Sequence, residues 1–179
     1  FFIEDASMFL LPIQMFYSRR IGETKDVAYN VEIPAYINNS IKLSGKNHKG
    51  FSYGLISAKT DNQITQNFDM ESEIKNNTYQ VARLRQDLFG GNSSIGILAT
   101  KFDGVRGVYN KVGNQYQARS IQKSNSWSFD GMFNYFENRL NIDFQFAQTD
   151  LDQKGYAYSV NSSYDINRFW SLEIDLENI

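Results

Sequence analysis

The feature that most constrains the fold is a set of four segments near the C-terminus in which apolar and polar residues alternate. Polar residues such as Ser128, Asp143 and Glu173 occupy every second position. The apolar positions are Trp127, Phe129, Gly131, Phe133 and Tyr135; Leu140, Ile142, Phe144 and Phe146; Tyr156, Tyr158, Val160 and Tyr164; and Trp170, Leu172, Ile174 and Leu176. A period of two is the side-chain period of a β-strand, so each segment predicts a strand with one apolar and one polar face.

Six earlier segments also predict strands, and the sequence shows no convincing helix longer than a couple of turns. The six segments are residues 14–21, 38–46, 51–60, 78–88, 94–102 and 115–121. Pro12 and Pro34 fall outside them, as expected, because proline cannot donate a hydrogen bond to a strand ladder. The chain therefore has about ten predicted strands, with lengths close to the roughly 9 to 11 residues that cross a bilayer at a tilt.

The connections between these strands are of two kinds. Tight polar turns are predicted at residues 47–50, 90–92, 136–139 and 166–168, where glycine and asparagine are frequent. Longer polar stretches lie at residues 61–77, 103–114 and 122–126. Short turns at one end and longer loops at the other are typical of bacterial outer-membrane barrels, in which the short turns face the periplasm.

Alternation alone does not say which face of the strands is inside. The chain is 41% hydrophobic and has no apolar run near the roughly 18 to 20 residues of a membrane helix, so we expect no helical span. A soluble barrel or sandwich with buried aromatics is one interpretation. Aromatic residues make up 15% of the chain, and together with the turn asymmetry they favour a membrane-spanning barrel, which uses aromatic girdles at both interfaces.

Composition removes several other classes of protein. The net charge is −2, so the basic footprint of a nucleic-acid-binding protein is missing. Cysteine is absent, which excludes disulfide scaffolds and cysteine-ligated metal sites. The chain starts at Phe1 without a recognisable secretory signal, so we expect either that a signal has been removed or that this is an internal piece of a longer protein.

No motif predicts catalysis, a cofactor or a metal. The single histidine, His48, lies in a predicted tight turn, and no second histidine is present to build a metal site. The Gly90-Gly91-Asn92 stretch lacks the lysine of a phosphate loop and is interpreted as a hairpin turn. Acidic residues on the polar faces are consistent with the acid and base of a glycosidase or with the lining of a hydrated lumen. These residues are Asp143, Glu173, Asp175 and Glu177.

One charged cluster is predicted on a strand face. Arg83, Arg85 and Asp87 are two residues apart and therefore share one side of their strand, and Arg19 and Arg20 add two more guanidinium groups elsewhere. Such a cluster in a barrel is either a structural charge network that narrows the lumen or a constriction that selects an anionic solute.

The first part of the chain resembles a known family. The element Phe16-Tyr17-Ser18-Arg19-Arg20-Ile21-Gly22, preceded by the phenylalanine-rich start at Phe1, resembles the opening of an uncharacterised outer-membrane β-barrel family common in Bacteroidetes. In that family the barrel follows a domain similar to carbohydrate-binding module family 9. Residues 41–46 with 50–55, and 83–87 with 91–96, resemble two of its hairpins, so the resemblance covers residues 1–102. Asp5 departs from the glycine that the family tends to have.

The resemblance implies that residues 1–179 are a single barrel region, part of a larger antiparallel up-and-down transmembrane β-barrel. It implies location in the bacterial outer membrane, with lipid as a partner, but no mechanism. From the alternation, the aromatic residues and this signature together, we expect a porin-like transport, channel or scaffold role in a complex with other outer-membrane or periplasmic proteins, without catalysis. Two alternatives stay open. One is a barrel hydrolase acting on lipid or glycan, with the lumen carboxylates or a serine near His48. The other is a soluble barrel that encloses an apolar ligand among Phe129, Phe133, Phe144 and Leu172.

Overall fold

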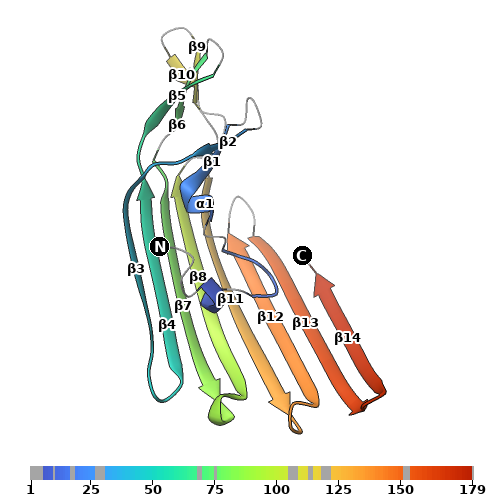
Figure 1. The fold of residues 1–179 in the computed structure, drawn as a ribbon. Coiled ribbons are helices and arrows are strands. Elements are labelled where there is room, and N and C mark those ends of the chain that lie inside the picture. The colour runs from blue at the N-terminus through green and yellow to red at the C-terminus, as the bar shows by residue number, and fades with distance from the viewer. Residues whose placement is uncertain are drawn as a thin grey trace.

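The computed structural model describes most of the chain (Figure 1). The described residues are 6–9, 11–16, 19–26, 31–67, 70–74, 76–104, 109–112, 115–117, 122–150 and 154–178. They form one large antiparallel sheet, two smaller sheets and an N-terminal segment that lies against one face of the large sheet. The structure is therefore all-β apart from a few short helical turns.

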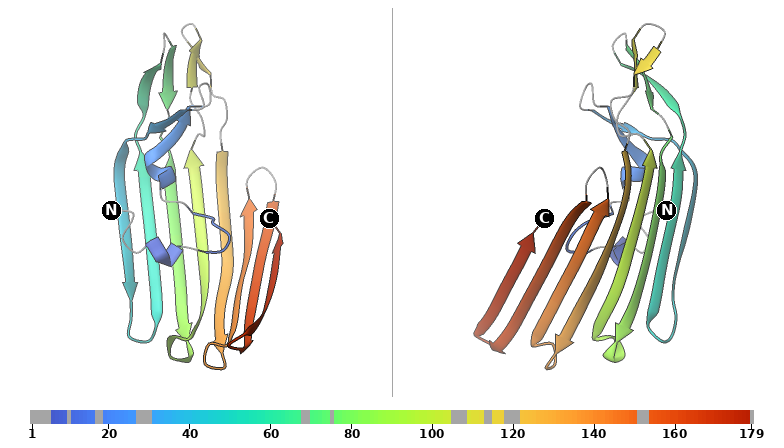
Figure 2. Two further views of the ribbon diagram at one scale, coloured as in Figure 1. Left: turned by 45° about the vertical axis from the view of Figure 1, so that its right-hand side comes forward. Right: turned by 180° about the vertical axis from the view of Figure 1, so that it is seen from behind.

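The large sheet has eight strands in the order β14-β13-β12-β11-β8-β7-β4-β3. Each strand pairs with the strand that precedes or follows it in this sheet, which is the predicted up-and-down topology. The strands are β3 (Ile37–Lys46), β4 (Phe51–Thr60), β7 (Thr78–Leu88), β8 (Ser93–Gly104), β11 (Gln122–Tyr135), β12 (Leu140–Asp150), β13 (Lys154–Asn167) and β14 (Trp170–Asn178). The sheet is twisted and curved, but its edge strands β3 and β14 do not meet, so it is an open sheet (Figure 2).

The sequence placed two segments wrongly, and a third is a strand only in its described part. Residues 14–16 lie outside any strand and α1 spans Arg19–Gly22, so the strand expected over residues 14–21 is not present in its described part. The strand expected over 115–121 appears only as β10 (Gln115–Gln117), in a small sheet, and residues 118–121 lie outside the described residues. Residues 122–126, expected to be a loop, extend β11 because they pair with β8 from Gln122 opposite Gly104 onward.

The two ends of the large sheet differ as predicted. The turns β3–β4, β7–β8, β11–β12 and β13–β14 are all short and lie together at one end, which we call the turn end (Figure 1). Gly50 and Asn138 adopt positive φ in two of these turns, at 81° and 67°. At the other end, the loop end, a second sheet has the order β10-β9-β6-β5, formed by β5 (Gln63–Asn67), β6 (Met70–Ile74), β9 (Tyr109–Val112) and β10.

The N-terminal segment packs across the sheet rather than joining it (Figures 1 and 2). It contains the 3-10 turn η1 (Ala6–Phe9), an irregular stretch and α1, and it leads into the hairpin of β1 (Glu23–Asp26) and β2 (Val31–Pro34). Its buried residues Phe9 and Ile21 form an apolar cluster with side chains from β4, β7 and β8, namely Ile56, Ala58, Val81 and Leu98. The sheet face that meets this segment is called the inner face below, and the opposite one the outer face.

Beside its apolar cluster the inner face also buries polar residues, whereas the outer face exposes large apolar ones. The buried polar residues of the inner face include Ser52, Arg83, Ser94, Ser128, Asp130 and Gln145. The outer face exposes large apolar residues, among them Ile41, Leu43, Leu55, Leu84, Ile97, Trp127, Phe129, Phe146, Tyr158, Leu172, Ile174 and Leu176. Phe129 and Leu172, which the soluble-barrel alternative encloses, are 38% and 55% exposed. Within the described residues, no helix has the length and apolarity needed to cross a bilayer.

Candidate functional site

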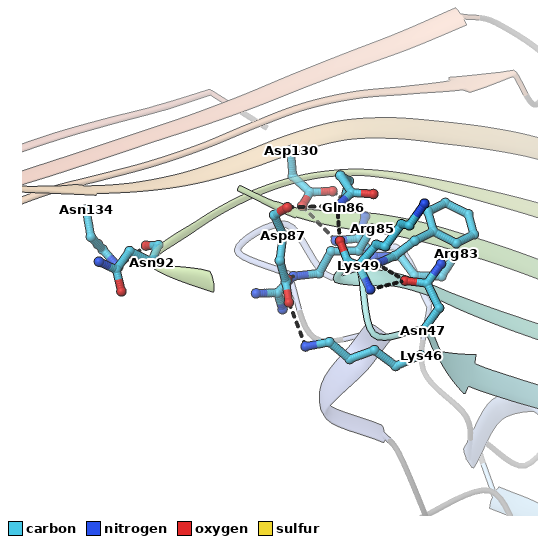
Figure 3. Close-up of polar contacts among 11 residues, drawn as sticks. Lys46, Asn47, Lys49, Arg83, Arg85, Gln86, Asp87, Asn92, Asp130 and Asn134 are labelled. Atoms are coloured by element: carbon cyan, nitrogen blue, oxygen red, sulfur yellow. Dashed lines mark hydrogen bonds and ion pairs between the residues drawn. The ribbon is translucent and has the colours of Figure 1, made fainter. Parts of the chain in front are cut away.

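The predicted cluster of Arg83, Arg85 and Asp87 lies on the inner face of β7, near the turn end (Figure 3). The structure divides it into two ion-pair systems. Arg83 forms a bidentate pair with Asp130 of β11: its Nη1 donates to Oδ1, and its Nη2 donates to Oδ2 at 2.7 Å. Arg83 and Asp130 have side-chain exposures of 3% and 12%, so this pair is largely removed from solvent.

The Arg83 guanidinium reaches Asp130 by crossing the strand between them. The register places Asp130 beside Gly96 of β8, and Gly96 beside Arg85 of β7. A Cβ atom on Gly96 would come within 2.6 Å of both Arg83 Nη1 and Nη2. Because Gly96 has no side chain, the Arg83 guanidinium can lie over β8 at this position. A larger residue at position 96 would displace Arg83 from Asp130.

The second ion-pair system lies closer to the turn end and is more exposed. Lys46 Nζ lies 2.6 Å from Asp87 Oδ2, and Arg85 Nε lies 3.5 Å from Asp87 Oδ1. The side chain of Lys46 is 60% exposed, which leaves this system open to water. Open ion pairs of this kind contribute little to stability, because solvent screens them.

Backbone contacts fix the β3–β4 turn to this system. Asn47 Oδ1 accepts hydrogen bonds from the backbone N–H of Lys49 at 2.9 Å and of Phe51 at 3.0 Å (Figure 3). Gln86 Nε2 donates to the Lys49 carbonyl oxygen at 2.9 Å, and the N–H of Asp87 donates to the Gly50 carbonyl oxygen at 2.9 Å. His48 is an exposed residue of this turn.

A glutamine on β12 ties the N-terminal segment to the inner face. The Ile13 N–H donates to Gln145 Oε1 at 2.6 Å, and Gln145 Nε2 donates back to the Ile13 carbonyl oxygen at 3.1 Å. Gln145 is only 1% exposed, so both amide atoms are matched to backbone groups in a dry environment. Gly54 lies under the same segment: a Cβ there would come within 2.7 Å of Met8 Sδ and 2.8 Å of Phe9 Cζ.

The acidic residues singled out in the sequence also lie on the inner face, toward the β14 edge. In register, Asp143 of β12 faces Asn161 of β13, and Asn161 faces Asp175 of β14. Asn161 Nδ2 donates to Asp175 Oδ1. Glu173 and Glu177 are exposed on β14. Across the described residues, no group of three or more histidine, cysteine, aspartate or glutamate side chains is placed to hold a metal ion.

The sequence therefore placed Arg83, Arg85 and Asp87 on one face, but it did not find their partners. Asp130 and Lys46 come from strands that lie on either side of β7 in the sheet, and their position depends on register rather than on periodicity. The only signal for Asp130 was its place on the polar side of its strand. Gln145 carried the same weak signal, and nothing in the sequence indicated its contact with Ile13.

The family-signature residues contribute to the inner-face cluster where they are described. The Phe16 ring lies 5.8 Å from the Phe9 ring, centroid to centroid, and Ile21 is fully buried. The Gly22 carbonyl oxygen accepts a hydrogen bond from the Ala35 N–H at 2.8 Å. Tyr17 and Ser18 lie outside the described residues, and for Arg19 and Arg20 the description covers only the backbone of α1.

Comparison with protein families gives one match. A family model described as a domain of unknown function (DUF5916) matches residues 1–178. The match confirms the resemblance of the first 102 residues to a family of unknown function and extends it over the C-terminal strands. Neither the curated proteins nor the solved structures contain a match to this chain.

Proposed function

Because the chain belongs to the family described as a domain of unknown function (DUF5916), and because its sheet exposes its aromatic face, we propose that it forms an arc of an outer-membrane β-barrel. In this proposal the outer face contacts lipid and the inner face lines the interior. The protein acts as a transport, channel or scaffold component, and its surface or interior binds other outer-membrane or periplasmic proteins. It carries out no catalysis, and it is part of a larger barrel.

The observation that carries this proposal is that the inner face buries charged and polar side chains while the outer face exposes large apolar ones. Arg83, Asp130 and Gln145 are buried, whereas Trp127, Ile97 and Ile174 are 42%, 51% and 50% exposed. In water, exposing a contiguous apolar surface of this size is unfavourable by roughly 25 cal/mol per Å². In a bilayer the same surface contacts hydrocarbon at no such cost, and charged side chains are placed away from lipid, in the interior of the barrel.

The extent of the apolar band also fits a bilayer. The alternation on β11 runs from Trp127 to Tyr135, which is about 27 Å along the strand at ~3.4 Å per residue. A tilt of about 40° reduces this to about 21 Å, close to the roughly 25 Å band of outer-membrane barrels. Exposed aromatics mark both ends of the band, with Trp127 and Tyr156 toward the loop end and Phe89, Phe136 and Phe169 in the short turns.

The open edges of the sheet determine what the proposal requires of the complete protein. Among the strands that the structure describes, β3 pairs with β4 alone and β14 with β13 alone. Unpaired strand edges are not tolerated in hydrocarbon, because each unsatisfied backbone group costs several kcal/mol there. The barrel must therefore be completed by further strands that pair with β3 and β14, as expected for an arc of a larger barrel.

Membrane fractionation of the full-length protein tests this proposal. After expression with its native targeting signal, the protein is expected in the outer-membrane fraction, resistant to extraction by sodium carbonate at high pH. A known periplasmic protein and a known outer-membrane barrel serve as controls in the same preparation. Recovery of the folded protein as a soluble periplasmic monomer would contradict the proposal.

A further inference from the structure

The outer face carries a groove of about 680 Å³ toward the loop end, across β7 and β8. In register, Leu55, Ala82, Ala99 and Trp127 form one row across four strands. The small side chains Ala82 and Ala99 form the low centre of this row, and Leu55 and Trp127 form its walls. Three strand spacings, or about 14 Å, separate the two wall residues. This volume lies within the range of small-molecule binding sites.

The two ends of the groove have different chemistry. Toward the turn end, the next outer-face residues of β7 and β8, just beyond the groove lining, are the larger and exposed apolar residues Leu84 and Ile97. Toward the loop end, the corresponding residues are Gln80 and Lys101, which line the groove with an amide and an ammonium group. The groove is therefore apolar over most of its length and polar at one end.

The polar end carries a net positive charge. Lys101 lines this end, and Lys59 and Lys123 lie on the same face in the next row, just beyond the groove lining. Asp103 is the acidic residue among them, and it pairs with Lys123 at 3.3 Å. Among the described residues, neither Lys59 nor Lys101 has an ion-pair partner. Two ammonium groups are thus left to interact with an anion at the mouth of an apolar groove.

We propose that this groove binds an anionic lipid, with an acyl chain lying over Ala82 and Ala99 and a phosphate head group held by Lys101 and Lys59. The inference rests on the proposed membrane location and adds a specific lipid class to it. Both ends of the groove match such a molecule. The apolar walls give the acyl chain a surface of matching polarity, and the lysines favour the charged head group over a zwitterionic one.

Fluorescence quenching at Trp127 tests this inference, because Trp127 forms one wall of the groove. The chain has two tryptophans, so Trp170→Phe leaves Trp127 as its single tryptophan. The full-length protein, with any tryptophan outside this chain also replaced, is reconstituted in phosphatidylcholine vesicles. Two preparations are compared. One contains a fixed fraction of phosphatidylglycerol with brominated acyl chains, and the other contains the same fraction of phosphatidylcholine with brominated acyl chains. Brominated phosphatidylglycerol is expected to be enriched beside Trp127 by at least about fivefold, because each lysine near an anionic head group supplies a factor of about five.

Two variants and one control make the result specific. Lys101→Gln combined with Lys59→Gln is expected to bring quenching by the two brominated lipids to the same level, and Ala99→Leu is expected to reduce quenching by brominated phosphatidylglycerol by filling the groove. Lys154→Gln is the matched control, because Lys154 is an exposed lysine of β13 at the same end of the sheet and three strands from Lys101. It is expected to leave the preference for the anionic lipid unchanged.

The outcomes separate failure of the inference from failure of the proposed function. Equal quenching of the parent protein by both brominated lipids would overturn the lipid site while leaving the membrane location intact. A preference that survives removal of both lysines, in Lys59→Gln with Lys101→Gln, would overturn it as well. Absence of quenching by either lipid would mean that Trp127 does not contact acyl chains, and would contradict the membrane location itself.

Discussion

Replacement of Asp130 by alanine is expected to lower the free energy of unfolding by about 3–5 kcal/mol. The substitution leaves the Arg83 guanidinium without its bidentate partner under the N-terminal segment, where the Arg83 side chain is 3% exposed. Arg83 Nε already lacks a hydrogen-bond partner among the described residues, so no other contact compensates for the lost carboxylate. Unfolding of the full-length protein in guanidinium chloride from phospholipid vesicles measures the effect.

The exposed ion pair of Lys123 and Asp103 provides the matched control for the buried one. Asp103→Asn removes the same kind of interaction in solvent and is expected to cost at most about 1 kcal/mol. Replacing both buried partners, as Arg83→Met with Asp130→Leu, is expected to recover most of the loss, because no uncompensated charge remains. Similar losses for Asp130→Ala and Asp103→Asn would contradict the assignment of Arg83 and Asp130 as the buried charge pair.

An arginine on the outer face is expected to be nearly as damaging, although the residue that it replaces is exposed. Ile97 lies near the middle of β8 and is 51% exposed. At an ordinary water-exposed position, such a substitution changes stability by no more than about 0.5 kcal/mol. On the lipid face of a barrel near the bilayer midplane, arginine costs about 2–4 kcal/mol. We expect the latter loss for Ile97→Arg, measured by unfolding from vesicles.

The control substitution for Ile97→Arg is Gln80→Arg on the neighbouring strand. Gln80 lies on the same outer face but in the polar row at the loop end, beside Lys101. Near the membrane interface the cost of arginine falls to about 0–1 kcal/mol. Equal and small effects of both substitutions would mean that the outer face is in contact with water, and would contradict its proposed contact with lipid.

The C-terminal strands of the large sheet were predictable because apolar residues occupy one face of each strand and polar residues mainly the other. Residues 78–88 were predicted as a strand with the bounds that β7 has in the structure, and the alternation at 127–135 gave the correct face for every residue of that part of β11. Gly131 fits the apolar face because the Phe144 ring occupies the space beside it: a Cβ there would come within 2.5 Å of Phe144 Cε1.

The N-terminal segment was not predictable from its own pattern. Residues 14–16 and 21 mix apolar and polar residues as a strand does. However, Phe16 and Ile21 are not part of a strand: their side chains pack onto the inner face of the large sheet. Their burial depends on Ile56, Val81 and Leu98, which lie far away in the sequence. Local periodicity does not contain that information.

The same limit applies to the charged cluster. Periodicity placed Arg83, Arg85 and Asp87 on one side of β7, but the pairing of Arg83 with Asp130 depends on the register of two further strands and on Gly96 between them. The contact of Gln145 with Ile13 depends on where the N-terminal segment crosses the sheet. Contacts of this kind follow from tertiary structure and leave no spacing in the sequence.

The proposed function requires that the outer face of the sheet contacts lipid and that the inner face lines the interior of a barrel. The most direct test is the accessibility of nitroxide labels on neighbouring residues of β13 in the reconstituted full-length protein. The chain has no cysteine, so Tyr158→Cys and Ser159→Cys each introduce one label site into it, on the outer and inner face respectively. The label at position 158 is expected to collide mainly with oxygen dissolved in the bilayer, and the label at position 159 mainly with a water-soluble nickel chelate. Equal access of the nickel chelate to both labels, or the reverse order, would contradict the claim.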